Sequence, residues 1–588
     1  MDTTTTHSGL PNGGGAIMPD TPESRHQTPE ILLGNPANRP LKVIIVGSGL
    51  SGIMMAYKIQ KMCQNVSMVV HEKEADIGGT WYVNRYPGAG CDIPSHTYSY
   101  NFALNPDWPL YCSHQPDIWK YLDKVCEVFE LRQYMRFRSQ ITRAEWLEDM
   151  GKWKVGICQK DEDETTENVE EELCDVFIYA TGALNGAKMP EVEGLDRFKG
   201  KLIHSSAWPR DYQKEQWEKE RVAVIGVGAS SIQLVPRIQP HVKSMDIFVR
   251  TGTWFSRIAD NFGEYKPYSS EHLGKFREDA QSLVGHVKAV EDDLAVCLDI
   301  QIAGSEMQKG ASEWTKAHMR EHIKDTRLFN GFLPNFGLGC RRITPGIPYM
   351  KAIQEPNVNV HFSAAAKFTE DGIVDASGVM TPVETIICAS GFDTSYRPRF
   401  PIIGRNGIDL GERWEQHPEA YLGITVPDMP NFFMLMGPSW PVHNGSIMGP
   451  LVATGDYVIA ALHKIQRDCI VSLCPRASVT RAFNEHVQAF AQRTVWVESC
   501  RSWFKNSEGR VTALWPGTGL HFMEAVKWPR WEDYQIERAH GNEWAVLGNG
   551  FCWAERTEGM DKTPFLSVEA LDEKWKREVL NNEKSTEN

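Results

Sequence analysis

Two glycine-rich turns, each placed directly after an apolar run, constrain the fold of this chain more than any other feature. The first turn follows the run 41–46 (LKVIIV), which is apolar enough for a strand buried on both faces of a parallel sheet. A helix over 53–62 and a second strand over 66–70 are expected after it. The turn itself carries Gly47, Gly49 and Gly52. This order predicts the βαβ unit that binds a dinucleotide.

The residue types of the first turn match what a bound pyrophosphate needs. Gly47 allows the tight turn, Gly49 lets the backbone approach the phosphates, and Gly52 lets helix and strand pack closely. The pyrophosphate then meets the helix N-terminus, where unpaired N–H groups favour an anion. Glu72, after the second strand, can accept hydrogen bonds from the ribose hydroxyls. A glycine-rich turn without a ligand is the alternative, and the complete unit argues against it.

A second unit repeats the plan with one change of charge. Its parts are a strand over 221–225 (RVAVI), glycines at Gly226 and Gly228, Ser231 in place of the third glycine, a helix over 232–238 and a strand over 244–249. Arg250 then stands where the first unit has Glu72. A guanidinium matches a 2′-phosphate, whereas a carboxylate matches a 2′-hydroxyl, so the second unit is predicted to bind NADP. A surface arginine at a strand end is the alternative.

The rest of the chain supplies pieces that complete the two sheets. The runs 178–182 (IYATG) and 387–391 (ICASG) each end in a small residue, a hydroxyl and a glycine. They resemble the strands that complete the nucleotide-binding sheets of two-dinucleotide flavoenzymes. The run 432–436 is expected to be the last strand of the first sheet. Between 261 and 335, apolar residues recur at three and four residues, which predicts a helical insertion.

Charge and cysteine usage narrow the class of protein. The 588-residue chain has a net charge of −14, so it offers no basic field to a nucleic acid or an anionic membrane surface. It has no N-terminal signal pattern and no apolar run of roughly eighteen residues for a membrane span. Its 13 cysteines lie singly, and the nearest pair, Cys469 and Cys474, lacks metal-ligand spacing, so no metal site is expected. These features predict a cytosolic location.

The stretch between the two units carries a motif of its own. It reads FKGKLIHSSAWP, with the pattern F-x-G-x-x-x-H-x-x-x-W-P at Phe198, Gly200, His204, Trp208 and Pro209. This pattern resembles the fingerprint of Baeyer–Villiger monooxygenases, which use FAD and NADPH, and the resemblance extends over about residues 41–553. In such a linker His204 is expected to be a hydrogen-bonded hinge between domains rather than an acid or a base.

The resemblance implies an α/β fold with two Rossmann-like dinucleotide-binding domains, one for FAD and one for NADP, and a helical insertion. The expected divisions are a disordered tail over 1–38, the first part of the FAD-binding domain over 39–209, the NADP-binding domain over 210–385 with the insertion over about 261–335, the second part of the FAD-binding domain with an aromatic-rich cap over 386–555, and a C-terminal tail over 556–588.

The resemblance also implies the cofactor contacts. Contacts to FAD are implied at Gly47, Gly49, Gly52, Glu72, Gly79, Thr80, Trp81, Asp92, Tyr98 and Ile141. Contacts to NADP are implied at Gly90, Cys91, Asp92, Gly226, Gly228, Ala229, Ser230, Ser231, Arg250, Thr251, Arg341 and Trp503. The run 339–343 (GCRRI) resembles the basic pair of the family, in which Arg341 would hold NADP and Arg342 would act on the flavin.

The implied activity is the conversion of a ketone to an ester or lactone with O2. NADPH would reduce the flavin, and the reduced flavin would form a C4a-peroxyflavin that attacks the ketone. Arg342 would keep the peroxide deprotonated and stabilise the oxyanion of the adduct, while Asp92 would orient Arg342 by a charge-assisted hydrogen bond. The insertion and the Trp-rich last third favour a bulky small-molecule ketone, such as a secondary-metabolite intermediate.

Three other functions compete with ketone oxidation. A pyridine-nucleotide disulfide reductase needs a cysteine pair against the flavin, and Cys91 has no partner at short spacing. A flavin monooxygenase that oxidises amine nitrogen or sulfur shares much of the pattern, but the Trp-Pro ending of the fingerprint and Arg342 favour ketone oxidation. A flavin-binding scaffold without turnover would need a broken site. The residues of the site are all in place, namely Glu72, Asp92, Arg250 and Arg342.

Overall fold

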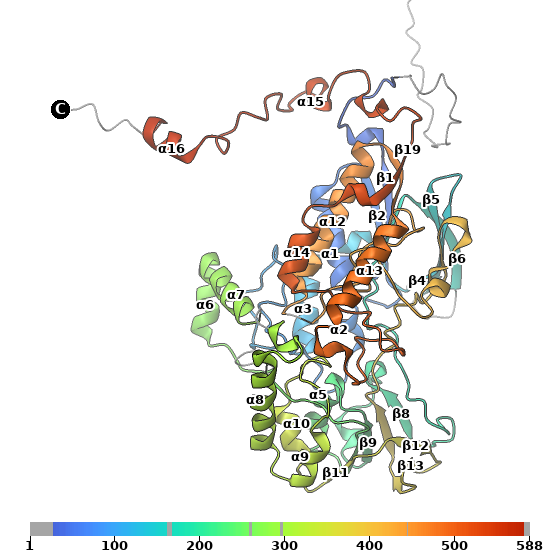
Figure 1. The fold of residues 1–588 in the computed structure, drawn as a ribbon, viewed down its shortest axis with the longest axis vertical. Coiled ribbons are helices and arrows are strands. Elements are labelled where there is room, and N and C mark those ends of the chain that lie inside the picture. Colours follow the sequence, from blue (N-terminus) through green and yellow to red (C-terminus); the bar gives the residue numbers. More distant parts are fainter. Residues whose placement is uncertain (1–27, 162–166, 258–261, 295–297, 444, 581–588) are drawn as a thin grey trace, which may run out of the picture. The chain divides into compact units, whose positions relative to one another are not determined.

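The computed structural model describes residues 28–161, 167–257, 262–294, 298–443 and 445–580 (Figure 1). The chain forms two compact units. The large unit comprises residues 41–462 and 472–536, and the small unit takes the remaining described residues. Both predicted nucleotide-binding turns belong to the large unit.

A five-stranded parallel sheet, sheet 1, holds the first turn. Its strands follow the order β17 (Phe432–Met434), β7 (Val176–Tyr179), β1 (Leu41–Val46), β2 (Val66–His71) and β3 (Met135–Arg136). The central strand β1 is almost wholly buried, as its continuous apolar run predicts. Two helices, α1 (Leu50–Met62) and α3 (Gln115–Val128), belong to the same part of the chain. The prediction that the run 432–436 supplies the last strand of this sheet is confirmed.

A second five-stranded parallel sheet, sheet 2, holds the second turn. Its strands follow the order β11 (Val358–His361), β10 (Ser244–Phe248), β9 (Arg221–Ile225), β15 (Thr385–Cys388) and β8 (Lys201–His204). The helices α5 (Ala229–Ile238) and α10 (Ile347–Ala352) belong to this part of the chain. Strand β8 comes from the fingerprint linker, so the linker adds an edge strand to sheet 2 rather than only joining two domains.

The predicted helical insertion is present. It consists of α6 (Ser270–Glu278), α7 (Ala280–Leu294), α8 (Glu306–His322) and α9 (Thr326–Phe332). Phe276, Leu283 and Val290, three residues of the helical pattern, are 6–7% exposed. Residues 261 and 295–297 of the predicted insertion lie outside the described residues.

Smaller elements complete the described chain. A four-stranded sheet contains β16 (Ile402–Ile403), β4 (Ser139–Leu147), β5 (Lys152–Lys160) and β6 (Glu167–Cys174), and a three-stranded sheet contains β12 (Ala365–Phe368), β13 (Gly372–Asp375) and β14 (Met380–Pro382). The remaining helices and strands are α2 (Thr80–Val83), α4 (Lys214–Trp217), α11 (Leu410–Arg413), α12 (Met448–Arg467), β18 (Ile470–Pro475), α13 (Ala477–Ala491), α14 (Gly519–Val526), β19 (Tyr534–Arg538), α15 (Trp553–Arg556) and α16 (Glu573–Trp575). Among the described residues, no helix is both long enough and apolar enough to cross a membrane.

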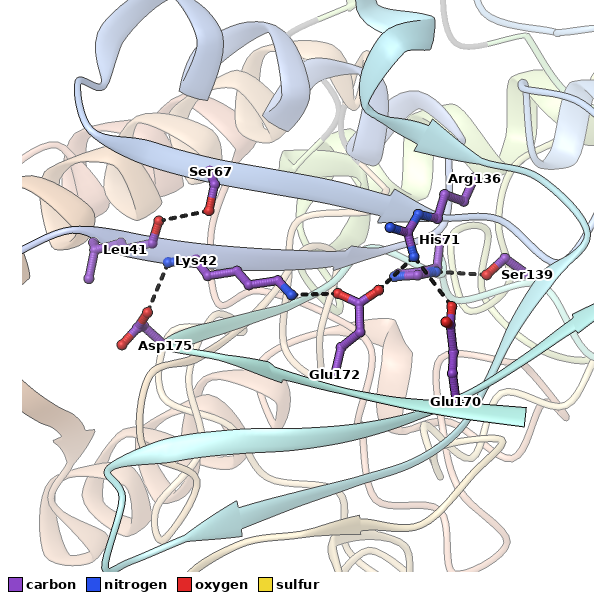
Figure 2. Close-up of polar contacts among 9 residues, drawn as sticks. All are labelled: Leu41, Lys42, Ser67, His71, Arg136, Ser139, Glu170, Glu172 and Asp175. Carbon is purple, nitrogen blue, oxygen red and sulfur yellow. Dashed lines mark hydrogen bonds and ion pairs between the residues drawn. The ribbon is translucent and has the colours of Figure 1, made fainter. Parts of the chain in front are cut away.

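Polar contacts attach the four-stranded sheet to sheet 1 beside the end of β2 (Figure 2). Lys42 of β1 and Arg136 of β3 both pair with the Glu172 carboxylate of β6, each at 2.6 Å. His71, the last residue of β2, shares a 2.7 Å hydrogen bond between its Nδ1 and Ser139 Oγ. Burial lowers the pKa of His71 to about 4, so its ring is neutral at pH 7. The contacts of His71 and Arg136 hold the carboxyl end of β2, where the predicted ribose-binding acid follows.

One expectation from the sequence is wrong, and one pairing was not predicted. Residues 28–38 are not a disordered tail, because within the small unit Leu33 pairs with Cys552 and its N–H donates to the Phe551 carbonyl at 2.9 Å. Residues 1–27 of the predicted tail lie outside the described residues, as do 581–588 at the other end. The cysteines do lie singly in the sequence, but a disulfide joins Cys340 and Cys500 across a separation of 160 residues, which their spacing did not predict.

Candidate active site

The first turn uses glycines where a side chain would collide. Gly47 has a φ of +99°, and a Cβ on it would lie 2.9 Å from the Ala180 carbonyl oxygen. A Cβ on Gly52 would lie 1.9 Å from the Gly47 carbonyl oxygen, so α1 packs against the turn at a distance that only glycine allows. The Gly47 N–H donates to the His71 carbonyl at 2.8 Å. The turn therefore lies at the carboxyl ends of β1 and β2, where open α/β sheets bind ligands.

Glu72 lies directly against this turn. Its Oε2 accepts hydrogen bonds from the Ser48 N–H at 2.8 Å and from Ser48 Oγ at 3.0 Å. Its Oε1 accepts from the Glu74 N–H at 2.9 Å, and the residue is 5% exposed. The carboxylate is thus oriented by its own loop and by the turn, beside the position that a ribose would take.

A second glycine segment approaches the first turn. Gly79 has a φ of +51°, and a Cβ on it would lie 3.0 Å from Gly49 Cα. Thr80 is exposed at the start of α2, while Trp81 is buried and donates from Nε1 to Tyr98 Oη at 3.3 Å. Five of the predicted FAD contacts therefore form a connected group of residues.

Asp92 and Arg342 form a bidentate ion pair, although 250 residues separate them in the chain. Arg342 Nη1 donates to Asp92 Oδ2 and Nη2 donates to Oδ1, each at 2.6 Å. The Arg342 side chain is 30% exposed and that of Asp92 is 13% exposed. Burial acting alone would lower the pKa of Arg342, but the Asp92 carboxylate outweighs burial and raises this pKa above its usual value. The guanidinium is therefore held as a cation in a set orientation.

The segment that carries Asp92 also contacts the helix of the second turn. Gln233 of α5 donates from Nε2 to the Gly90 carbonyl at 2.8 Å, and its Oε1 accepts from Tyr86 Oη at 2.7 Å. Cys91 is buried, and burial raises the pKa of its thiol to about 12, so the thiol is protonated at neutral pH. Gly90, Cys91 and Asp92 thus lie where the parts of the chain that carry the two turns meet.

The second turn copies the first. Gly226 has a φ of +109°, a Cβ on it would lie 2.5 Å from the Ala389 carbonyl oxygen, and its N–H donates to the Phe248 carbonyl at 3.1 Å. A Cβ on Gly228 would meet no described atom within 4 Å, so the turn is open on that side. Ser231 is completely buried, so its hydroxymethyl group fits the third position. The other predicted contacts of this turn, Ala229 and Ser230, are the first residues of α5.

Three arginines gather after β10, beside the second turn. Burial lowers the pKa of Arg250, and the positive charge of Arg501 lowers it further. Burial also lowers the pKa of Arg341, and there Arg250 adds to the shift. Arg341 Nη1 donates to the Gly252 carbonyl at 3.4 Å, while its buried Nε has no hydrogen-bond partner among the described residues. Thr251, which lies between Arg250 and Gly252 in the chain, is partly exposed. Guanidinium groups that repel one another favour a bound anion such as a phosphate.

Two other predicted contacts are packed into hydrophobic clusters. Ile141 lies in β4, is 3% exposed, and belongs to a core cluster with Trp146 and Trp153, so its side chain is a core residue. Trp503 is partly exposed and packs its ring 4.8 Å from that of Phe504. It belongs to the same segment as Arg501.

The fingerprint residues are mostly buried or tightly packed. His204 Nδ1 accepts from the Ser206 N–H at 3.2 Å, and its Nε2 donates to the Gly391 carbonyl at 3.0 Å. Burial lowers the pKa of His204, so the ring is neutral and both nitrogens are used. A Cβ on Gly200 would lie 2.2 Å from the Glu384 carbonyl oxygen. The other three are Trp208, which is buried, and Phe198 and Pro209, which are partly exposed. His204 is therefore held by hydrogen bonds at both ring nitrogens, and its role as a hinge between domains stays a prediction.

Sequence reasoning missed three contributors to this region: Arg501, Gln233 and the Cys340–Cys500 disulfide. Arg501 belongs to the same run as Trp503 (RSW, residues 501–503), and its positive charge was the available signal. Gln233 and the disulfide gave no local signal, because their partners lie far away in the chain.

The fold and the two paired turns define a flavoprotein with two dinucleotide-binding domains. A family model described as flavin-binding monooxygenase-like matches residues 40–276. The FAD-binding monooxygenase stcW of Emericella nidulans is 51% identical over 567 residues, covering 95% of this chain and 94% of that protein. A Baeyer-Villiger monooxygenase of Pseudomonas aeruginosa is 33% identical, covering 86% of this chain and 94% of its own.

A crystal structure of OTEMO in complex with FAD and NADP matches with a TM-score of 0.73 and 25% identity, covering 84% of this chain and 99% of that one. The fold class predicted from the sequence is confirmed by this likeness. The chain belongs to the family of FAD- and NADPH-dependent Baeyer–Villiger monooxygenases.

Proposed function

We propose that this protein inserts one oxygen atom of O2 beside the carbonyl of a ketone to give an ester or a lactone, with FAD and NADPH as cofactors. The observation that carries the proposal is the Asp92–Arg342 pair, whose two 2.6 Å hydrogen bonds hold a cationic guanidinium in place. Membership of the family supports the same reaction.

The first turn fits FAD. Gly49 and Gly79 approach each other so closely that a Cβ on Gly79 would lie 3.0 Å from Gly49 Cα, which keeps side chains away from a bound pyrophosphate. Glu72 stands beside the turn for the ribose hydroxyls. We assign FAD to Gly47, Gly49, Gly52, Glu72, Gly79, Thr80, Trp81, Asp92 and Tyr98. Bound FAD, once reduced by NADPH, would supply the activation of O2.

The second turn fits NADP. Gly228 leaves the turn open, and the helix N-terminus of α5 offers N–H groups to a pyrophosphate. Arg250, Arg341 and Arg501 supply positive charge at the end of β10, where a 2′-phosphate would lie. We assign NADP to Gly90, Cys91, Asp92, Gly226, Gly228, Ala229, Ser230, Ser231, Arg250, Thr251, Arg341, Arg501 and Trp503.

Arg342 would act on the negative charge that grows on oxygen as a ketone carbonyl is attacked. Both of its terminal nitrogens bond Asp92, and each still has a second N–H for another acceptor. Its pKa is raised, so it stays cationic across the neutral and alkaline range. Asp92 fixes the plane of the guanidinium before the reaction, which is how preorganised charge lowers a barrier.

The helical insertion contacts the segment that carries Asp92, and we expect it to border the site of a large ketone. The Gly263 N–H donates to the Asp92 carbonyl at 3.2 Å, and the Tyr111 N–H donates to the Lys266 carbonyl at 2.7 Å. Tyr268 Oη then shares a 3.1 Å hydrogen bond with His286 Nε2 of α7. The insertion is thus tied to the segment that carries Asp92, and its helices would form a wall of the substrate site.

The proposal includes two further expectations. The FAD-binding domain would combine residues 39–209 and 386–555, with β8 contributed to sheet 2, and residues 210–385 would bind NADP. The protein would be cytosolic, which the ten free cysteines among the described residues support.

The test uses holoenzyme with FAD, NADPH and a panel of small and polycyclic ketones, a thioether and an amine. Mass spectrometry of the products should find an ester or lactone that is heavier than the ketone by one oxygen atom, about 16 mass units. Arg342→Ala should lower this rate about 100-fold or more, because it removes a preorganised charge.

A matched control distinguishes a role in the site from a general ion-pair effect. Arg413 pairs with Asp428 at 2.7 Å elsewhere in the large unit, so Arg413→Ala removes a comparable pair and should leave the rate nearly unchanged. NADPH oxidation without any ester from any ketone, or equal rates in Arg342→Ala and wild type, would contradict the proposal.

A further inference from the structure

The Cys340–Cys500 disulfide joins the two loops that carry the arginines of the site. Cys340 directly precedes Arg341 and Arg342, and Cys500 directly precedes Arg501. The two Cα atoms are 6.3 Å apart, and the residues are 0% and 5% exposed. A covalent bond at this place therefore limits how far the proposed NADP-binding segment near residue 501 can move from the loop of Arg341 and Arg342.

The two loops also meet through hydrogen bonds that do not need the disulfide. The Gly337 N–H donates to Glu498 Oε2 at 2.6 Å, and Lys505 Nζ donates to the Glu498 carbonyl. Because of these contacts, both cysteines would stay close to each other when reduced. The disulfide could therefore form again after reduction without a large movement of either loop.

A lysine lies against both sulfur atoms. Lys505 Nζ is 3.6 Å from Cys500 Sγ and 4.0 Å from Cys340 Sγ. A neighbouring cation stabilises a thiolate, which is the nucleophilic form of cysteine. Lys505 is therefore placed to stabilise a thiolate on either cysteine when the pair is reduced.

The remaining cysteines show that the chain is not a disulfide scaffold. Ten other described cysteines are free, and eight of them are buried. In a reducing compartment, a single disulfide among free thiols is typically transient, and is either catalytic or redox-sensing. This disulfide lies next to the proposed reaction site rather than in a distant core.

We propose that Cys340 and Cys500 are a reversible redox modification site that reacts with a hydroperoxide such as H2O2 and, when oxidised, holds NADP more tightly. The proposal rests on the proposed function for the assignment of NADP to Arg341 and Arg501. One thiolate attacks the O–O bond of H2O2 and becomes a sulfenic acid, and the released hydroxide takes a proton to form water. The second thiolate attacks that sulfur and displaces hydroxide, which is protonated to a second water. Two thiols and H2O2 thus give one disulfide and two waters.

The modification itself is measured by mass spectrometry on the FAD-loaded protein. The enzyme is reduced with dithiothreitol, freed of reductant, exposed to H2O2 and alkylated with iodoacetamide. Peptides that carry Cys340 and Cys500 should be alkylated together in the reduced sample and linked to each other after H2O2. Lys505→Gln should slow the formation of this link about fivefold or more, because it removes the neighbouring cation. An unchanged rate in Lys505→Gln, or sulfurs that stay alkylatable after H2O2, would overturn the proposal.

The consequence for NADP is measured by calorimetric titration with NADP+ and no ketone. The oxidised enzyme should bind NADP+ about fivefold or more tightly than the reduced one, because loop ordering is already provided. Cys340→Ser and Cys500→Ser should each behave as the reduced enzyme at any redox state, whereas Cys63→Ser should keep the difference. Equal NADP+ affinity in both redox states would overturn the proposal.

The two proposals fail separately. If NADP+ affinity follows the disulfide but no ketone is oxygenated, the proposed reaction fails and the redox site stands. If esters form but NADP+ affinity ignores the thiol state, the redox site fails and the proposed reaction stands.

Discussion

The two nucleotide-binding turns of the large unit share one backbone design and carry opposite charges. In each, the first glycine has a positive φ, +99° at Gly47 and +109° at Gly226, and donates to the carbonyl of the residue that ends the next strand. In each, a Cβ on this glycine would strike an alanine carbonyl, that of Ala180 or Ala389. The end of that strand differs, because Glu72 follows β2 while Arg250 closely follows β10.

This difference separates two tasks. The shared backbone suits what FAD and NADP have in common, a pyrophosphate at a helix N-terminus. The side chains at the strand end suit what differs, because Glu72 is held by hydrogen bonds from its own turn whereas Arg250 stands near Arg501 and Arg341. Changes in the backbone should therefore affect folding and binding of the whole cofactor, and changes in the charges should affect the choice of cofactor.

The largest expected effect comes from the third position of the turns. Gly52→Ala would place a Cβ 1.9 Å from a backbone oxygen, so we expect a stability loss of about 3 kcal/mol or more and loss of FAD. Ser231→Ala at the matching position should cost less than about 1 kcal/mol, because a side chain already fits there. Thermal unfolding and flavin content measure both. Similar losses in the two variants would show that the turns do not differ in packing.

A reversal of the charge at the second turn should reverse its preference. Arg250→Glu should lower kcat/KM for NADPH about 100-fold or more, because a carboxylate would face the 2′-phosphate among the remaining arginines. NADH lacks this phosphate and is the internal control, so its kcat/KM should not fall. Steady-state kinetics with both nucleotides measure the change. Equal losses with NADPH and NADH would refute the assignment of Arg250 to the 2′-phosphate.

The residue that ends the second strand should give the first turn an acid sensitivity that the second turn lacks. His71 takes the place of Phe248, and burial lowers its pKa to about 4, below its usual 6.5. The folded state thus resists protonation, while the unfolded chain binds a proton below about pH 6.5. Stability from this group is intact above pH 6.5 and falls as the pH drops towards 4.

From these values, the wild type should lose about 2 kcal/mol between pH 7 and pH 5 through this residue. His71→Phe should be less stable at pH 7, because Ser139 loses its partner, but should lose less than the wild type on acidification. Urea unfolding midpoints at pH 7, 6 and 5 measure this slope. If the stability of the wild type and of His71→Phe fell equally as the pH is lowered, His71 would not be the source of the acid sensitivity.

The smallest expected effect belongs to Arg501. It is exposed, so its contribution to phosphate binding is screened by water. Arg501→Ala should raise KM for NADPH about fivefold and leave KM for NADH unchanged. Trp503→Ala, on the same segment, should raise KM for both nucleotides, because its ring carries no phosphate contact. If Arg501→Ala raised KM for both nucleotides and Trp503→Ala raised KM for NADPH alone, the roles assigned to the two residues would be wrong.

Local patterns predicted much of the fold, because strands buried on both faces need continuous apolar runs. The bounds of β1 and β9 coincide with the apolar runs 41–46 and 221–225. The helices of the insertion followed from apolar spacing. The return of β17 to sheet 1 needed the family pattern, since three residues alone do not distinguish one sheet from another.

Contacts that depend on distant chain segments could not be predicted from local sequence. Cys340 and Cys500 are 160 residues apart and no motif links them. Residues 28–38 are folded because Leu33 pairs with Cys552, which lies near the other end of the sequence. The Asp92–Arg342 pair was predicted only because each residue stands in a separate family motif, and the structure brings them together.

The most direct test of the proposed reaction follows the oxygen atom. Holoenzyme, NADPH and an accepted ketone are supplied with 18O2 in ordinary water, and the ester is fragmented to locate the heavy atom. We expect one 18O in the bridging oxygen between the carbonyl carbon and the migrated carbon. With Arg342→Ala, the labelled ester should form about 100-fold more slowly or slower still. An ester without label, or label only in the carbonyl oxygen, would contradict oxygen insertion by this protein.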